Sequence, residues 1–304
     1  MHEIVIISGK GGTGKTSLTA AFAALAENAV LADCDVDASD LHLVLSPSGT
    51  AAEPFRSGRK ALINKETCVS CGACLAHCRF GAVRMSGSCA GEASFKIDEL
   101  SCEGCGTCVA FCPVKAVEFP EKDCGKLYVS KTRFGPMAHA ELRPGSGNSG
   151  KLASKVRAKA RELADKAGSE LIIVDGPPGI GCPVIASISG ATFLVVVTEP
   201  TPSGAHDMGR VLKLAEHFGV CAAVCVNKAD VNPDKTAEII GSLRNSQSVA
   251  FSCMVPYDTR VTDAQLQGKA VVEIAKDGAA REIAGLWDKI CSHLELSSRK
   301  GAQN

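Results

Sequence analysis

Short apolar runs alternate along the chain with amphipathic segments, and this alternation predicts strands and helices in turn. The apolar runs cover residues 4–8, 29–32, 171–175, 192–198 and 220–227, and helical spacing of apolar positions covers residues 15–27, 150–167, 203–218 and 234–243. Because the runs are continuously apolar, the strands are expected to be buried on both faces, as in a parallel sheet. The pattern therefore predicts a doubly wound α/β domain with a mostly parallel sheet.

A duplicated segment interrupts this pattern. Residues 63–83 and 97–117 superpose at a shift of 34 positions, and apolar positions such as Ile63 and Ile97 repeat together with four cysteines. The polar and glycine-containing segments 46–59 and 143–150 are predicted to be linkers. We therefore expect an α/β domain in two parts, residues 1–60 and 122–296, a small inserted α+β domain at residues 61–121, and a polar tail at residues 297–304.

The cysteines of each copy follow the spacing C-x2-C-x2-C-x3-C, which is the run of bacterial ferredoxins, in which the fourth cysteine serves the other cluster. This spacing predicts two 4Fe-4S clusters. The first would be held by Cys68, Cys71, Cys74 and Cys112, and the second by Cys102, Cys105, Cys108 and Cys78. Zinc is the competing interpretation, because C-x2-C pairs also bind zinc. Two runs of three cysteines at this spacing favour iron-sulfur clusters.

A glycine-rich motif, G-x-x-x-x-G-K-[ST], lies between the first predicted strand and the first predicted helix. Its residues, with the serine that follows, are Gly9, Lys10, Gly11, Gly12, Thr13, Gly14, Lys15, Thr16 and Ser17. Glycines let successive backbone N-H groups and the helix N-terminus face a phosphate. Lys15 would add a positive charge, and Thr16 would bind Mg2+. The motif therefore predicts a nucleotide site.

With Lys10 as its second residue, the motif resembles the deviant Walker A sequence, KGGxGK[ST], of the MinD, ParA and nitrogenase iron protein family. The resemblance covers most of the chain outside the repeat. It implies a P-loop fold, ATP and Mg2+ as cofactors, and a dimer in which Lys10 reaches the partner's phosphates. It also implies that Asp35 orients the attacking water and supports Mg2+, and that Asp175 holds the metal through water. Lys10, Lys15, Asp35 and Asp175 are the predicted catalytic residues. A solvated lysine and aspartates that merely cap strand ends are the alternatives.

Two further segments resemble base-binding parts of this family. Asn227 begins an N-K-x-D segment and fits adenine, although GTPases read guanine with the same four positions. Pro256 and Asp258 belong to a segment that resembles the adenine-flanking loop. Cys182 follows Asp175 at the separation of a cluster-binding cysteine in the nitrogenase iron protein, so it is either an interface cluster ligand or a buried free thiol. ATP is favoured as the nucleotide because of Lys10.

Composition narrows the class of protein. The chain has 304 residues, is 45% hydrophobic and 22% charged, and its 33 Lys and Arg balance 33 Asp and Glu, so we expect a globular protein that does not gather nucleic acid by charge. No signal peptide and no run of about 20 apolar residues is evident, which predicts a cytoplasmic protein without integral membrane association. Sixteen cysteines in such a chain favour metal or redox chemistry over disulfides.

An apolar helix face near the end of the chain is predicted to pack on the sheet rather than on a membrane. It consists of Ile283, Leu286, Trp287, Ile290 and Leu294.

The sequence predicts an ATP-hydrolysing iron-sulfur protein in which the nucleotide state of a dimeric ATPase gates electron transfer through two 4Fe-4S clusters. Its expected partners are a second copy or a related ATPase, together with a redox protein. Two alternatives stay open. The first is an ATP-dependent carrier or assembly factor for iron-sulfur or other metal clusters. The second is a ParA-like or MinD-like positioning ATPase that uses its clusters as a redox sensor.

Overall fold

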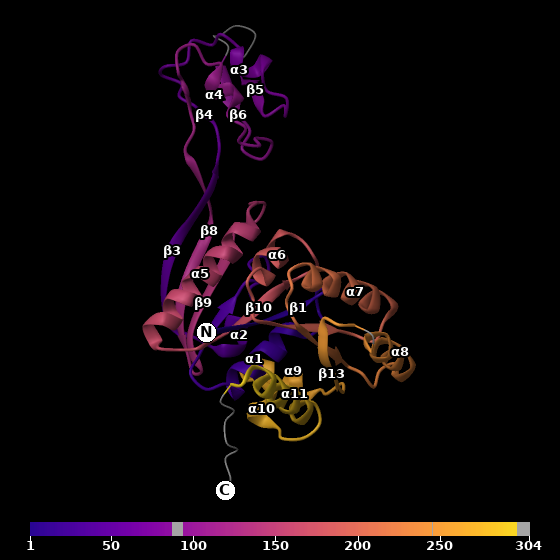
Figure 1. Ribbon diagram of the computed structural model, residues 1–304. Helices are drawn as coiled ribbons and strands as arrows, with labels where there is room; N and C mark the ends of the chain where they lie inside the picture. The colour runs from indigo at the N-terminus through magenta and orange to yellow at the C-terminus, as the bar shows by residue number, and fades with distance from the viewer. Residues whose placement is uncertain (87–93, 245, 297–304) are drawn as a thin grey trace. The chain divides into compact units, whose positions relative to one another are not determined.

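A computed structural model describes residues 1–86, 94–244 and 246–296 (Figure 1). The chain divides into two compact units. The first consists of Met1–Glu53, Lys126–Leu142 and Ser149–Asn304, and the second of Pro54–Gly125 and Arg143–Asn148. The boundaries expected at residues 61 and 121 fall inside the second unit. The predicted polar tail, residues 297–304, lies outside the described residues.

The first unit is built around a nine-stranded sheet of order β13-β12-β11-β1-β10-β2-β9-β8-β3. These strands are β1 (His2–Ser8), β2 (Ala29–Asp33), β3 (Ser48–Arg59), β8 (Glu121–Thr132), β9 (Gly135–Leu142), β10 (Leu171–Pro178), β11 (Phe193–Thr198), β12 (Ala222–Asn227) and β13 (Val249–Val255). From β13 to β9 every neighbouring pair is parallel. The five strands predicted from apolar runs form the buried centre of this sheet, so the α/β prediction is confirmed.

Helices cover both faces of the sheet. They are α1 (Lys15–Leu25), α2 (Leu41–Leu45), α5 (Ser149–Ala167), α6 (Cys182–Ile188), α7 (Pro202–His217), α8 (Pro233–Leu243), α9 (Arg260–Leu266), α10 (Val271–Ile274) and α11 (Ala279–Leu294). The main core lies between the strands and α1, α2 and α9–α11, while α5, α6 and α7 pack on the opposite face. Ile283, Leu286, Trp287 and Ile290 of α11 are buried in this core, which confirms the predicted packing of the last helix on the sheet.

The segment predicted to be a linker, residues 46–59, does cross the boundary between the two units, but it does so as the edge strand β3 and not as an irregular segment. Most of its side chains are exposed and only Phe55 is buried, so no apolar run marks it as a strand. Backbone hydrogen bonds to β8 hold it instead. The chain passes from the first unit into the second along β3 and returns along β8.

None of the helices in the described parts of the chain combines the length and the apolar character needed to span a bilayer.

The second unit carries the duplicated segment, and its two halves have matching elements. It contains two-stranded pairs, β4 (Leu62–Ile63) with β7 (Val117–Glu118) and β5 (Val83–Ser86) with β6 (Ser94–Ile97), and the short helices α3 (Ala73–Ala76) and α4 (Thr107–Ala110). Gly72 and Gly106, which are 34 positions apart, both have φ near +76° at the start of these helices. His77 and Phe111 are likewise equivalent, and their rings stack with centroids 4.0 Å apart. The two halves therefore meet at positions that correspond in the repeat.

Candidate functional site

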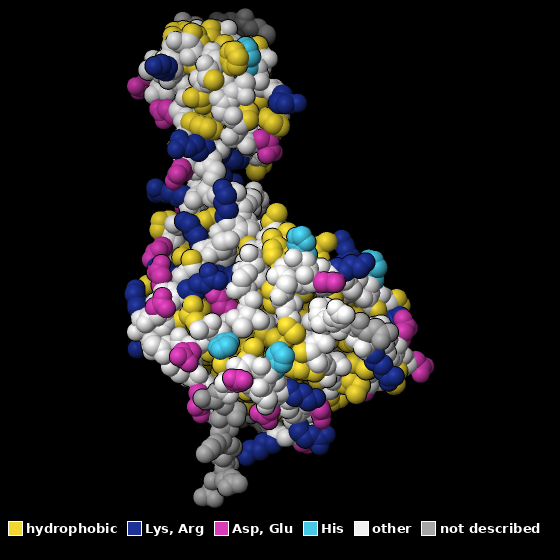
Figure 2. Space-filling model, viewed as in Figure 1, with side chains coloured by type: hydrophobic (Ala, Val, Ile, Leu, Met, Phe, Trp, Pro, Cys, Tyr) yellow, Lys and Arg dark blue, Asp and Glu magenta, His cyan; other side chains and the backbone are white. Residues whose placement is uncertain are grey.

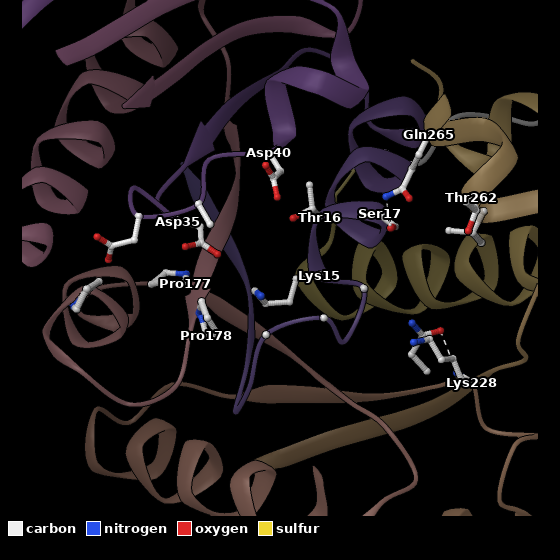
Figure 3. A pocket seen from close by; sticks show the side chains of 18 residues that line it. Lys15, Thr16, Ser17, Asp35, Asp40, Pro177, Pro178, Lys228, Thr262 and Gln265 are labelled. Carbon is white, nitrogen blue, oxygen red and sulfur yellow. Dashed lines mark hydrogen bonds between the residues drawn. The ribbon is translucent and has the colours of Figure 1, made fainter. Parts of the chain in front are cut away.

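A pocket of about 560 Å3 opens beside the P-loop at the carboxyl ends of the central strands (Figure 3). The predicted loop residues that line it are Gly11, Gly12, Gly14, Lys15, Thr16 and Ser17. Lys15 extends toward the side of the pocket on which Asp35 lies, and Asp40 lies above Thr16. Parallel strands present their ligand-binding loops at this edge of an α/β sheet. The predicted phosphate loop and the predicted acidic segment thus lie around one hollow.

Asp175 ties the end of β10 to helix α1. Its carboxylate accepts hydrogen bonds from the hydroxyls of Thr16 (2.7 Å) and Thr19 (2.9 Å). The side chain is buried, and burial raises the pKa of Asp175 despite the opposing effects of the Thr16 hydroxyl and the Lys15 ammonium group. A buried carboxylate next to the Thr16 hydroxyl is suited to hold a divalent cation, which supplies the missing positive charge.

Asp33 was not assigned a role from the sequence, yet it organises the acidic segment after β2. Its carboxylate accepts hydrogen bonds from the Ser39 hydroxyl (2.7 Å), the Leu41 backbone N-H (3.2 Å) and the Asp35 backbone N-H (3.1 Å). Burial, followed by the charge of Asp175, raises the pKa of Asp33. Burial also raises the pKa of Asp35 to about 6, although Lys15 opposes the rise. Asp33 therefore fixes the segment that presents Asp35 to the pocket.

Asn227 braces the P-loop from the end of β12. Its Nδ2 donates to the carbonyl oxygen of Thr13 at 2.8 Å, and its Oδ1 accepts from the backbone N-H of Lys228 at 3.0 Å. A Cβ on Gly14 would lie 2.4 Å from Asn227 Nδ2, and Gly14 has a φ of +93°. Asn227 thus lines the predicted nucleotide pocket. Its hydrogen bond to Thr13 also stabilises the conformation of the P-loop.

Replacing Gly14 with alanine is expected to destabilise the first unit and to weaken ADP binding. An L residue at this φ costs roughly 1–2 kcal/mol, and the new methyl group would in addition displace Asn227. Urea denaturation and ADP titration measure the two effects. Gly209→Ala is the matched control, because nothing lies within 4 Å of its Cβ position on α7. An unchanged unfolding midpoint together with unchanged ADP affinity would contradict the prediction.

The remaining predicted base-binding residues lie elsewhere. Asp230 accepts a hydrogen bond from the Tyr257 backbone N-H at 2.6 Å and, with Pro256, lines a different groove. Asp258 binds Arg260 at 2.8 Å and accepts from the backbone N-H of Ala279. Neither Pro256 nor Asp258 is among the residues that line the pocket beside the P-loop. Asp230, the position that GTPases use to read guanine, is also absent from that lining.

Helix α9 supplies lining residues that sequence reasoning missed. Thr262 and Gln265 face the pocket, and Gln265 Nε2 donates to the Ser17 hydroxyl at 2.8 Å (Figure 3). Lys228 and Asp40 line it as well. No motif marks α9, whose only sequence signal is that it follows the last strand. These polar groups lie where a bound nucleotide would extend beyond the phosphate loop.

Lys10 does not line the pocket that the rest of the loop surrounds. Its ammonium group lies 3.3 Å from Glu199 Oε2 and 3.4 Å from the Thr201 hydroxyl. Glu199 also pairs with Lys228, at 2.6 Å from its other carboxylate oxygen. Lys10 therefore extends away from the phosphate site of its own chain.

The eight cysteines of the repeat line two separate cavities in the second unit. One small cavity, of about 20 Å3, is lined by Cys68, Cys71, Cys74 and Cys112. The other, also of about 20 Å3, is lined by Cys78, Cys102, Cys105 and Cys108. The fourth cysteine of each run lies with the first three of the other run. This grouping is the one that the bacterial ferredoxin spacing predicts.

Each set of four repeat cysteines borders one small cavity of the second unit. Among the residues that the structure describes, no three His, Cys, Asp or Glu side chains converge closely enough to hold one metal ion. A cubane cluster binds each thiolate at a different iron atom, so its four ligands surround a cavity instead of converging on a point.

Cys182 is the first residue of α6 and is exposed, which does not agree with the alternative of a buried thiol. A Cβ at Gly150 would lie 3.1 Å from the Cys182 Cβ, so the start of α5 passes close to this side chain. Its neighbour Pro183 lines the nucleotide pocket. The role of Cys182 as an interface cluster ligand stays a prediction.

Comparison with known proteins agrees with this site. Residues 4–271 match the CobQ/CobB/MinD/ParA nucleotide binding domain. The uncharacterized protein MJ0578 of Methanocaldococcus jannaschii is 34% identical over 233 residues, which cover 76% of this chain and 79% of that protein. Septum site-determining protein MinD of Pyrococcus horikoshii with Mg-ADP is 15% identical, with a TM-score of 0.57 over 96% of this chain and 97% of that one. A Cyanothece McdA variant with ATP is also 15% identical, with a TM-score of 0.56 over 99% of both chains. The chain belongs to the CobQ/CobB/MinD/ParA nucleotide-binding family.

Proposed function

We propose that this protein is a dimerising, Mg2+-dependent ATPase whose nucleotide state gates electron transfer by two 4Fe-4S clusters held in the second unit. The grouping of the eight repeat cysteines around two cavities, with Cys78 and Cys112 exchanged between the runs, carries this proposal. When bound, such clusters supply reversible one-electron transfer. In this proposal residues 61–121 are an inserted ferredoxin-like domain.

The ATPase part of the proposal rests on family membership and on the pocket. Lys15 and the loop glycines are placed to bind phosphates, and the Thr16 and Asp175 pair is placed to hold Mg2+. Asp35 would orient the attacking water, as the resemblance implies. ATP is preferred over GTP because Asp230 is bound to the Tyr257 backbone outside the pocket.

Coupling between nucleotide and clusters would begin at α2. Asp33 holds the first residue of this helix through the Leu41 backbone N-H, and Arg133 donates to the carbonyl oxygen of Leu45 (2.8 Å) at its other end. Strand β3, which leads into the second unit, starts three residues after Leu45. A shift of the Asp35 segment on ATP binding thus has a short covalent route toward the cysteine-containing unit.

The surface of the second unit suits a redox partner. Several large apolar side chains near the repeat cysteines are exposed on it, and hydrophobic side chains gather there in Figure 2. They include Val69, Leu75, Phe80, Phe111 and Val114. Exposed apolar groups that are adjacent to a redox centre favour protein contact over solvent contact. We therefore include a redox protein among the expected partners.

Anaerobic purification tests the proposal. We expect about eight iron atoms per chain, from two 4Fe-4S clusters, and ATP hydrolysis that requires Mg2+. The EPR signals or reduction potentials of the clusters should differ between ADP and a non-hydrolysable ATP analogue. Protein without iron would overturn the cluster assignment, and identical spectra in both nucleotide states would overturn gating. Rapid transfer of clusters to an apo-protein would instead favour the carrier function.

A positioning ATPase is the second candidate, and the comparisons favour it. The MinD structure named above is called a septum site-determining protein, and it shares the fold of the first unit. In this candidate function the ATP-bound dimer binds a cellular surface or filament, and the clusters report redox state. ATP-dependent sedimentation with such a surface, altered by cluster oxidation, would support this function. Nucleotide-dependent cluster potentials without any surface binding would support electron transfer.

A further inference from the structure

Three neighbouring strands of the sheet end in charged residues of alternating sign. Lys10 follows β1, Glu199 follows β11 and Lys228 follows β12, and the three strands are adjacent and parallel. Glu199 contacts both lysines, at 3.3 Å and 2.6 Å, and only 16% of its side chain is exposed. Parallel strands bring these residues together although they lie far apart in the sequence.

Glu199 is charged at neutral pH in this arrangement. Burial by itself would raise its pKa, but the hydrogen bonds and positive charges of Lys228 and Lys10 outweigh burial, and the pKa of Glu199 is lowered. Thr201, the N-cap of α7, adds a hydroxyl oxygen at 3.4 Å from the Lys10 ammonium group. Lys10 thus has two polar partners within its own chain.

We infer that Glu199 holds Lys10 in the isolated chain and thereby sets the protein concentration at which ATP-bound chains dimerise. The inference rests on the proposed dimeric ATPase and on the role that the family resemblance implies for Lys10, which is to reach the partner's phosphates. In this proposal Lys10 turns from Glu199 toward the partner's phosphate, so each subunit breaks this ion pair on dimerisation. Glu199 acts through Lys10 and is a positioning residue.

The ion pair belongs to the partly exposed class, since 32% of the Lys10 side chain is exposed. Such pairs contribute up to about fivefold each to an equilibrium, and the dimer breaks two of them, so we expect Glu199→Gln to lower the dimerisation midpoint by up to about 25-fold. Glu199 does not line the nucleotide pocket, but its partner Lys228 does, so Glu199→Gln frees both lysines. A change in the affinity for ADP would come from Lys228, whereas the shift in the dimerisation midpoint comes from Lys10.

Sedimentation velocity with a non-hydrolysable ATP analogue, over a range of protein concentrations, gives the midpoint. Glu216→Gln is the matched control, because it makes the same change at an exposed position of the neighbouring helix α7, and it should behave as the original protein. Lys10→Ala should abolish the ATP-dependent dimer. If Lys10→Ala still dimerises, the role of Lys10 and this inference both fail.

If Lys10→Ala abolishes the dimer but Glu199→Gln leaves the midpoint unchanged or raises it, the inference alone fails. A damaged fold would lower the hydrolysis rate per dimer, whereas release of Lys10 moves only the midpoint. Should Glu199→Gln not fold, Glu199→Asp provides the test. Its shorter side chain cannot span the two lysines, so its midpoint should also fall, and a midpoint equal to that of the original protein would overturn the inference.

Discussion

Replacing Cys112 with serine should remove about half of the iron from the anaerobically prepared protein, and the cluster lost should be the one that the first cysteine run begins. Cys112 lies in the second run, but it lines the cavity of Cys68, Cys71 and Cys74. A 4Fe-4S cluster with three thiolates is labile because one iron loses its ligand. Iron quantitation and EPR measure the loss.

Pairs of replacements test the crossed arrangement directly. Cys71→Ser combined with Cys112→Ser should remove no more iron than either change alone, whereas Cys78→Ser combined with Cys112→Ser should remove nearly all of it. Uncrossed binding would make the first pair, and not only the second, remove both clusters. Cys124→Ser is the control, because this buried cysteine of the same unit donates to the Ser57 carbonyl and lines neither cavity.

Asp175→Asn should lower the rate of ATP hydrolysis on the order of 100-fold, the range seen when a buried group that stabilises charge is removed from an active site. Asparagine keeps the shape but not the negative charge beside Thr16. The Mg2+ concentration that supports half of the maximal rate should rise. Steady-state hydrolysis measured across a Mg2+ titration checks both effects.

Asp165→Asn provides the comparison, because it removes a carboxylate from an exposed position of α5 in the same unit. Its hydrolysis rate should equal that of the original protein. If Asp175→Asn retained both the rate and the Mg2+ dependence, the metal site would have to be placed elsewhere. Binding of the variant to ADP without Mg2+ verifies that the P-loop is intact.

Local patterns in the sequence predicted the centre of the sheet and the P-loop because both depend on neighbouring residues. Continuous apolar runs mark the strands that are buried on both faces, and the φ of +93° at Gly14 belongs to the loop itself. The grouping of the eight cysteines also follows from spacing, since the repeat constrains both runs together.

Features that depend on distant segments could not be predicted in this way. Glu199 meets Lys10 only because β11 lies beside β1, and Asn227 meets Thr13 only because β12 lies beyond β11. Strand β3 is held by its backbone at the sheet edge, and its exposed side chains give no apolar signal. The family resemblance implied that Pro256 flanks the adenine base, but this residue lines a groove other than the nucleotide pocket.

The stacked rings of His77 and Phe111 join the two copies of the repeat through a direct contact. The two side chains occupy the same position in the two copies, and each directly precedes the cysteine that lines the other copy's cavity. A substitution of either ring therefore alters the packing beside both of these cysteines. Replacing either ring with alanine would remove a contact that the two halves of the second unit share.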